Sequence, residues 1–437
     1  MKRILFFLTF ILYYASSFAQ YSINGTVYTY PVSASTGLQA VYIANGLSAV
    51  TISYTAASTS SVKWYSYTSA ISSKSDVSAS DIATTNNGST ITYSITAPED
   101  GTGYLVEVDG NLKPALWMID YSKHIPTIDH ITATASSDCN NKSVAISVDK
   151  SENLTYYSIA GVSGTVSLYY KIQYNKQSWN DTSESFVSSI YTSDWKTINN
   201  KFYVDAPLMD TRFIITGDQI ADQLGISQSV SSDTYIEKFT EAHMITKQTA
   251  HNSENEIDSV GSNGLGGSAP AEITFKGIGN EPTTAYYEWT IYKKSDLKNW
   301  IARYNDQNIS YTFSNAGNYI VYLETTNQES TCKDTASVEF SISESFLDLP
   351  NYFTPNASEG VNDIYKVSYK SLVSFKATIM NRWGNKIYQW TDPSQGWDGK
   401  YNGRYVSPGV YYISVIAKGS DGILYKRGRD INILTTP

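Results

Sequence analysis

The 437-residue sequence contains only two cysteines, Cys139 and Cys332, which lie far apart along the chain. So few cysteines exclude a disulfide framework, or a zinc site built on cysteine, within any one domain. The wide spacing favours two unpaired buried thiols over a bridge between domains. Whether the two cysteines pair stays open at this point.

Charged side chains are also scarce, at 17% of the chain, and the formal net charge is −9. An acidic chain without a visible basic stripe argues against nucleic acid as a partner. The charge is uneven, because residues 346–437 hold eleven Lys and Arg against seven Asp and Glu. A basic C-terminal region therefore follows a strongly acidic body.

Long hydrophobic runs are absent as well: no segment approaches the roughly 20 apolar residues that cross a bilayer, so no membrane span is predicted. The first residues show the order of a cleavable signal peptide, with basic Lys2 and Arg3, a short apolar run, and a small-residue junction ending at Ala19. We predict that residues 1–19 are removed and that the mature chain begins at Gln20. The junction has no cysteine to accept a lipid anchor.

Tyrosine is abundant, with 36 Tyr against 14 Phe, and Ser, Thr, Val and Ile fill the runs between turns. Apolar residues alternate with polar ones in many of these runs, which is typical of half-buried strands. Only the stretch around residues 218–225 has a helical pattern. The sequence therefore predicts an all-β protein made of tandem immunoglobulin-like β-sandwich domains.

Length and composition predict four such units after the signal peptide. A stretch rich in Gly, Ser and Asn separates the second from the third and is typical of a linker. The predicted boundaries are an N-terminal β-sandwich at 20–125, a second β-rich domain at 126–248, the linker at 249–270, a third β-sandwich at 271–345 and a C-terminal domain at 346–437.

The third unit carries Trp289 in an early strand and the tripeptide Gly317-Asn318-Tyr319 before a later one. In these features it resembles the PKD-type β-sandwich modules of bacterial surface proteins. The resemblance implies a compact immunoglobulin-like sandwich with Trp289 buried.

The C-terminal region carries five short motifs in a fixed order. They are Pro350-Asn351-Tyr352-Phe353-Thr354-Pro355-Asn356, Val361-Asn362-Asp363, Met380-Asn381-Arg382-Trp383-Gly384-Asn385, Gly396-Trp397-Asp398-Gly399-Lys400-Tyr401-Asn402-Gly403 and Pro408-Gly409-Val410-Tyr411-Tyr412.

With these motifs the region resembles the gliding-motility-associated C-terminal domain, the type B sorting domain of type IX secretion substrates in Bacteroidetes. The resemblance implies recognition by the type IX secretion machinery and a final location at the cell surface or outside the cell. Where the family usually has a Gly-Asp-Gly run, this chain has Ala357-Ser358-Glu359-Gly360, so a cation site in that loop is not implied.

Aromatic residues in small sandwiches usually fill the core. We therefore expect Trp383 and Trp397 to be core or turn-packing residues rather than contacts with the secretion machinery. Lys426, Arg427 and Arg429 are expected on a solvated hairpin, with docking on an acidic partner as the alternative.

No catalytic residue, cofactor or metal site is predicted. The four histidines lack the helical spacing of zinc sites. Residues 264–269 match the glycine-rich motif of dinucleotide-binding proteins, but the strand before it and the helix after it, which that motif requires, are not predicted here. Paired carboxylates follow no spacing rule, so a hydrolase site in residues 20–248 stays an alternative.

The sequence thus favours a secreted or surface-bound binding protein without enzymatic activity over a hydrolase or a structural surface-layer component. Its ligand, a glycan or a protein, is expected at residues 20–248, where aromatic side chains are available for stacking. The competing expectation, favoured for the tryptophans, is that they are buried. The residues concerned are Trp64, Tyr65, Tyr67, Trp117, Trp179 and Trp195.

Overall fold

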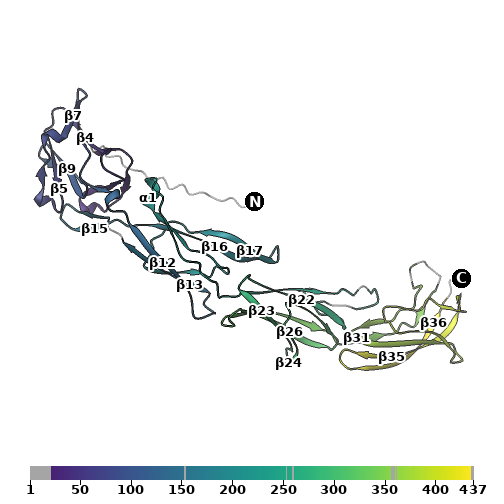
Figure 1. Ribbon diagram of the computed structural model, residues 1–437. Helices are drawn as coiled ribbons and strands as arrows, with labels where there is room; N and C mark the ends of the chain where they lie inside the picture. The colour runs from purple at the N-terminus through teal and green to yellow at the C-terminus, as the bar shows by residue number, and fades with distance from the viewer. Residues whose placement is uncertain are drawn as a thin grey trace.

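The computed structural model describes residues 21–151, 154–251, 253–257, 260–355, 360 and 362–434. The predicted signal peptide and its cleavage before Gln20 lie outside these residues. Within them the chain forms β-sheets with one short α-helix, α1 (Gln219–Gln223), in the stretch with the helical pattern, so the all-β class is confirmed. Four sandwich units follow one another in an extended row, from purple to yellow in Figure 1. No described helix has the length and apolar character that a membrane span requires.

The first unit packs a four-stranded sheet against a larger one. The smaller sheet has the order β1 (Tyr21–Asn24), β4 (Thr51–Ala57), β8 (Thr90–Thr96), β7 (Ile82–Asn86). The larger has the order β2 (Tyr28–Tyr30), β3 (Leu38–Ala44), β11 (Ala115–Asp120), β9 (Thr102–Val108), β5 (Val62–Tyr67), β6 (Ser75–Asp76), with β10 (Asn111–Leu112) beside β9. Short 3-10 turns are η1 (Ala34–Thr36), η2 (Ile71–Ser73), η3 (Ala79–Asp81) and η4 (Tyr121–Lys123).

The larger sheet is buried on both faces. Side chains alternate across a strand, so Leu116 and Met118 of β11 enter the core of the first sandwich while Trp117 and Ile119 pack against the second unit. The indole of Trp117 lies 5.7 Å from the ring of Tyr157 in that second unit. The first two units therefore share a hydrophobic interface.

The second unit places two sheets around that shared core. One has the order β12 (Thr127–Ala135), β13 (Ser143–Ser151), β18 (Lys201–Asp205), and the other β17 (Ser185–Thr192), β16 (Tyr170–Asn180), β19 (Ile214–Asp218), β20 (Ser229–Ser231). A small hairpin joins β14 (Thr155–Tyr157) to β15 (Ser163–Thr165).

Buried Asp218 ties the two front units together. One carboxylate oxygen accepts the amides of Ile220 and Ala221 at the start of α1, and the other accepts the Tyr121 hydroxyl at 2.6 Å. Burial, reinforced by this carboxylate, raises the pKa of Tyr121, which stays a neutral donor.

The third unit is a sandwich of a three-stranded and a four-stranded sheet, and its Trp289 is fully buried, as predicted. The sheets are β21 (Ala242–Gln248), β22 (Ala271–Gly279), β25 (Asn308–Phe313), and β24 (Asp296–Tyr304), β23 (Thr284–Lys293), β26 (Gly317–Asn327), β27 (Lys333–Ile342). Because β21 pairs with β22 along its whole length, this sandwich begins at Ala242, inside the predicted second domain at 126–248.

The segment 249–270 is not the free linker that its composition predicts. Its described residues contact the fourth and third units: the Ile257 amide donates to the Tyr369 carbonyl at 2.7 Å, and the Gly267 amide donates to the Ser341 carbonyl at 2.9 Å. Gly266 has a positive φ, and a Cβ there would lie 2.3 Å from the Ser341 oxygen. The glycines that suggest flexibility permit close packing instead.

The fourth unit contains a five-stranded sheet with the order β29 (Tyr352–Phe353), β36 (Leu424–Ile433), β35 (Gly409–Gly419), β31 (Leu372–Met380), β32 (Lys386–Trp390). Two short pairs cover one face and one end: β28 (Phe346–Asp348) with β30 (Ser368–Lys370), and β33 (Lys400–Tyr401) with β34 (Arg404–Tyr405).

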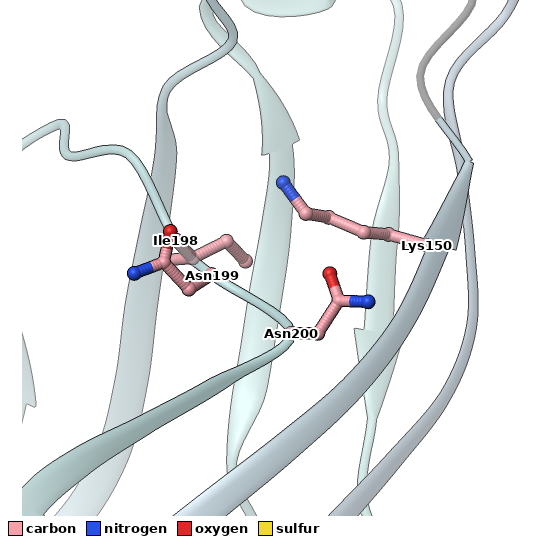
Figure 2. Close-up of a pocket in the computed structure, with 4 residues that line it drawn as sticks. All are labelled: Lys150, Ile198, Asn199 and Asn200. Atoms are coloured by element: carbon pink, nitrogen blue, oxygen red, sulfur yellow. The ribbon is translucent and has the colours of Figure 1, made fainter.

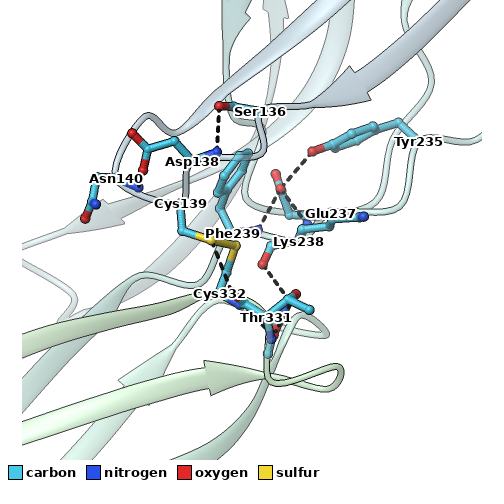
Figure 3. Close-up of a disulfide and its surroundings, with 11 residues drawn as sticks. Ser136, Asp138, Cys139, Asn140, Tyr235, Glu237, Lys238, Phe239, Thr331 and Cys332 are labelled. Carbon is cyan, nitrogen blue, oxygen red and sulfur yellow. Dashed lines mark hydrogen bonds between the residues drawn. A yellow bond between two sulfur atoms is a disulfide. The ribbon is translucent and has the colours of Figure 1, made fainter.

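A disulfide between Cys139 and Cys332 joins the second unit to the third, with the two Cα atoms 5.5 Å apart (Figure 3). The prediction of two unpaired thiols is therefore wrong. The cysteines meet because their units pack side by side through a small cluster that contains Leu208 and Phe239, and sequence separation carries no information about such packing.

Glu237 organises the polar side of the same junction (Figure 3). Its carboxylate accepts the Leu208 amide at 2.7 Å, the Phe239 amide at 3.0 Å and the Tyr235 hydroxyl at 3.0 Å. Burial nevertheless raises the pKa of Glu237, because desolvation outweighs these bonds. The segment is fixed to the third unit by Asn327, whose side-chain amide donates to the Lys238 carbonyl at 3.0 Å.

Candidate functional site

The motif residues of the fourth unit divide into a buried cluster and an exposed turn. In the buried cluster, the Phe353 ring lies 5.7 Å from Tyr365 and 5.4 Å from Trp397. Trp397 is fully buried, exchanges backbone hydrogen bonds with Tyr365, and donates its indole N–H to the Lys400 carbonyl at 2.9 Å. Trp397 is thus the core residue that the sequence predicts.

The two residues after Trp397 form a tight turn. Asp398 accepts the Lys400 amide at 3.0 Å, and Gly399 has a φ of 75°. A Cβ on Gly399 would lie 2.7 Å from the Cβ of Pro355, so the first motif packs directly on the fourth. These motif residues specify the fold of the domain.

The first motif also acts through its backbone. The Pro350 carbonyl accepts the Tyr365 hydroxyl at 2.7 Å, and the Asn351 carbonyl accepts the Asn432 amide at 2.9 Å. These bonds fix the entry of the chain against the last strand.

The loop between the first two motifs is described in part, and Asn356 lies outside the described residues. At its ends the Thr354 amide donates to the Asn362 carbonyl at 3.1 Å, and the Asp363 carboxylate accepts the Gly360 amide at 2.7 Å. Among the residues that the structure describes, no cluster of three or more His, Cys, Asp or Glu side chains is arranged to hold a metal ion.

The third motif forms the turn between β31 and β32. The Asn381 side-chain oxygen accepts the amides of Trp383 and Asn385, both at 3.0 Å, and Gly384 adopts a φ of 81°. Trp383 itself is 70% exposed, and the Arg382 guanidinium lies 4.3 Å from the centre of its ring. The expectation that Trp383 packs in the core or on the turn is wrong.

Two of the three basic residues near the C-terminus support the fold. Arg427 donates to the Leu347 carbonyl at 2.6 Å, and Arg429 donates to the Leu349 carbonyl. Lys426 is exposed on β36. The two arginines therefore hold the chain before the first motif against the main sheet, rather than standing only in solvent.

Most of the aromatic residues considered for ligand stacking in the first two units are buried. Trp179 is half-buried, because it stacks on His243 at the junction with the third unit, with ring centres 4.0 Å apart. Trp195 is half-buried under the ammonium of Lys171. The buried members are Trp64, Tyr65, Tyr67 and Trp117.

A cavity of about 390 Å³ opens in the second unit (Figure 2). It is lined by Lys150, Ile198, Asn199 and Asn200, and the Lys150 ammonium lies 5.7 Å from the centre of the Tyr170 ring. This lining offers a cation and amides rather than the paired carboxylates of a glycosidase.

A second cavity, of about 230 Å³, lies beside Trp195 and α1. Asp218 and Asp222 are among its lining residues, but Asp218 is committed to the helix cap and to Tyr121. This cavity therefore does not present a pair of free carboxylates either.

The outer face of the third unit carries an aromatic strip, which we define as Trp300, Tyr292 and Tyr322. Trp300 lies opposite Tyr292 on the neighbouring strand, and the Tyr292 and Tyr322 rings are 6.1 Å apart. Trp300 is 56% exposed. Sequence reasoning missed this strip, although a Trp among the charged residues of β24 is a signal that it faces water.

Ion pairs flank the strip on the same face. Arg303 pairs with Glu288, and Lys333 pairs with Glu324 at 2.9 Å. The face thus combines exposed aromatic rings, of which Tyr292 and Tyr322 meet edge to face, with donors and acceptors that are already oriented.

Two family models match the chain. Residues 347–426 match the CHU_C type IX secretion signal domain, and residues 131–232 match a fibronectin type III domain. The first match confirms the resemblance of the C-terminal domain, which indicates export to the cell surface or secretion and implies recognition by the type IX secretion machinery. No curated protein matches the chain.

Solved structures that are similar consist of tandem modules. The tetra-tandem repeat in the extending region of a large adhesion protein is 13% identical, with 90% of this chain and 97% of that chain covered and a TM-score of 0.22. The FN1–FN3 domains of chicken CNTN1 are 14% identical, with 70% and 98% covered and a TM-score of 0.22. These likenesses concern the fold and carry no argument about function.

Proposed function

We propose that this chain is a non-catalytic adhesion protein, delivered outside the cell through its type IX secretion signal, and that the aromatic strip of the third unit binds an extracellular glycan. The observation that carries the proposal is the exposure of Trp300 beside Tyr292 and Tyr322 on an open sheet face. In the first two units, by contrast, most of the aromatic side chains considered for ligand binding are buried.

The geometry of the strip favours a glycan over a protein. A stable protein partner buries roughly 800 Å² on each side around an apolar core. Here the aromatic rings are few, and the ion pairs Arg303–Glu288 and Lys333–Glu324 stand beside them. Flat rings next to oriented polar groups suit a ligand that presents both C–H faces and hydroxyl groups, at small entropic cost to the protein.

The experiment is a glycan array probed with the purified mature chain, followed by titration of the best ligand. Trp300→Ala is expected to weaken binding about tenfold, because the loss of one stacking ring corresponds to about 1.4 kcal/mol. Trp383→Ala removes an even more exposed indole from another unit and serves as the matched control, with binding unchanged.

Binding that is equal in Trp300→Ala and in the unchanged protein would overturn the assignment of the strip. A silent array together with specific capture of one protein would overturn the glycan in favour of a protein ligand.

A further inference from the structure

The turn that carries Trp383 is built rigidly although its tryptophan contributes little to the core. Asn381 fixes the turn with two side-chain hydrogen bonds, and the Gly384 amide donates to the Asn381 carbonyl at 2.9 Å. A large apolar ring that a fixed turn holds in water keeps the unfavourable hydration of its surface and adds no buried area to the core. Such a ring is preorganised for a partner, since its position is set before binding.

The turn lies at the end of the fourth unit that points away from the rest of the molecule. β31 starts beside Ser371, whose amide donates to the Ser268 hydroxyl at the junction with the third unit. Its nine residues extend about 30 Å from there to Met380 and the turn. In Figure 1 this unit forms the yellow end of the row. Among the described residues, no other sandwich unit therefore stands between the turn and an approaching partner.

Strand register gathers further exposed apolar residues on this end. Tyr412 lies opposite Met380, and Val410 lies opposite Asn432, which in turn lies opposite Tyr352. Tyr412 is 45% exposed and Tyr352 is 53% exposed. These three residues and Trp383 lie at the same end of the sheet, and we call them the distal tip (Trp383, Tyr412, Val410, Tyr352).

The charge beside Trp383 is basic, whereas the acidic Asp430 lies opposite Tyr412 elsewhere on the tip. Arg382 stacks on Trp383, and Lys386 follows the turn at the start of β32. An arginine next to an exposed tryptophan is the pairing that dominates binding energy at protein interfaces. A receptor that accepts it needs an apolar pocket for the indole and carboxylates for the guanidinium.

We propose that the distal tip is the surface by which this domain docks on the type IX secretion machinery, in an apolar pocket with an acidic rim. Trp383 is the anchor and Arg382 supplies the charge contact. Trp397, in the neighbouring motif, maintains the fold. The inference rests on export through the C-terminal domain and is independent of the glycan proposed for the third unit.

The test is surface display of the full chain in a host with type IX secretion, measured as the ratio of surface to periplasmic protein. Trp383→Ala is expected to lower that ratio at least about tenfold, as for an interface anchor. Arg382→Glu is expected to lower it by a similar factor. Trp300→Ala and Lys418→Glu, which change an exposed Trp on another unit and an exposed Lys near the junction, are the matched controls and are expected to behave like the unchanged chain.

Normal display of Trp383→Ala overturns the proposal. Unfolding of the domain by Trp383→Ala, seen as a large loss of thermal stability, also overturns it, because the ring would then be structural. A purified chain that is dimeric and becomes monomeric on Trp383→Ala would assign the tip to a second copy instead. A chain truncated from Phe346 onward distinguishes failure of the sorting role from failure of the tip. If the truncated chain is still displayed, the sorting role of the domain is wrong. If the truncated chain is not displayed but Trp383→Ala is displayed normally, only the assignment of the tip is wrong.

Discussion

The junction between the first two units is largely apolar and carries one buried hydrogen bond, from Tyr121 to Asp218, whereas the junctions that follow are held by a disulfide and by several polar groups. Trp117 sits between the front units, 5.6 Å from Tyr67 of its own unit and 5.7 Å from Tyr157 of the next. The junction of the third and fourth units instead relies on Glu256 and its partners. The front half thus has no mostly exposed tryptophan, whereas the rear half leaves Trp300 and Trp383 available for recognition.

The largest effect is expected from breaking the apolar junction. Trp117→Ala should destabilise the front pair by about 3–5 kcal/mol, because the side chain is fully buried between two units. Chemical denaturation of the full chain measures this loss. Trp300→Ala, with its ring in water, should change stability by less than about 0.5 kcal/mol. Equal effects of the two substitutions would contradict the contrast.

The disulfide is expected to come next. Cys139→Ser with Cys332→Ser should lower the stability of the junction between the second and third units by about 2–4 kcal/mol, since the bridge closes a long loop. Denaturation with and without reductant measures the effect. The oxidised parent and the double variant should differ, while the reduced parent should resemble the variant. A parent that is insensitive to reductant would contradict a structural role for the bridge.

A smaller loss is expected at Glu237. Glu237→Gln replaces a group that accepts several hydrogen bonds with one that also brings donors, which should cost about 1–3 kcal/mol. Burial raises the pKa of Glu237 in the folded state. The stability that this raised pKa contributes is therefore present below the pKa of Glu237 in the unfolded chain, and it is lost as the pH rises through the pKa in the folded state. Calorimetry at several pH values should show this fall in stability with rising pH in the parent and not in Glu237→Gln.

The smallest effect is expected at the junction of the third and fourth units. Burial raises the pKa of Glu256, but hydrogen bonds from His251, Ser268 and Tyr369 and the charge of His251 outweigh it, so the pKa lies below its ordinary value. A lowered pKa gives stability that is present above the unfolded value and is lost as the pH falls through the folded one. The melting difference between the parent and Glu256→Gln should therefore shrink in acid. A difference that is constant with pH would contradict this.

The sequence predicts the strands and the motif core well, because both depend on local pattern. The alternation of apolar and polar residues identifies β9 and β13. The burial of Trp289 and Trp397 is expected because aromatic side chains usually fill the core of small sandwiches. The uninterrupted apolar run of β11 is itself a signal of burial on both faces.

The remaining features depend on how the units meet. Cys139 and Cys332 pair across two units, and β21 joins a sheet whose other strands lie beyond a long polar segment. Trp383 and Trp397 have similar sequence settings, yet one is exposed on a turn and the other lies in the buried cluster with Phe353. Composition cannot separate such cases, because burial is decided by tertiary contacts.

Oxidative labelling of the tryptophans in the native mature chain, read residue by residue by mass spectrometry, tests the central contrast most directly. The account predicts that Trp300 and Trp383 react first, that Trp179 and Trp195 follow, and that Trp64, Trp117, Trp289, Trp390 and Trp397 stay protected until the protein unfolds. Reaction of Trp64 or Trp117 as fast as Trp300 would contradict the claim that the mostly exposed tryptophans, Trp300 and Trp383, both lie in the rear half.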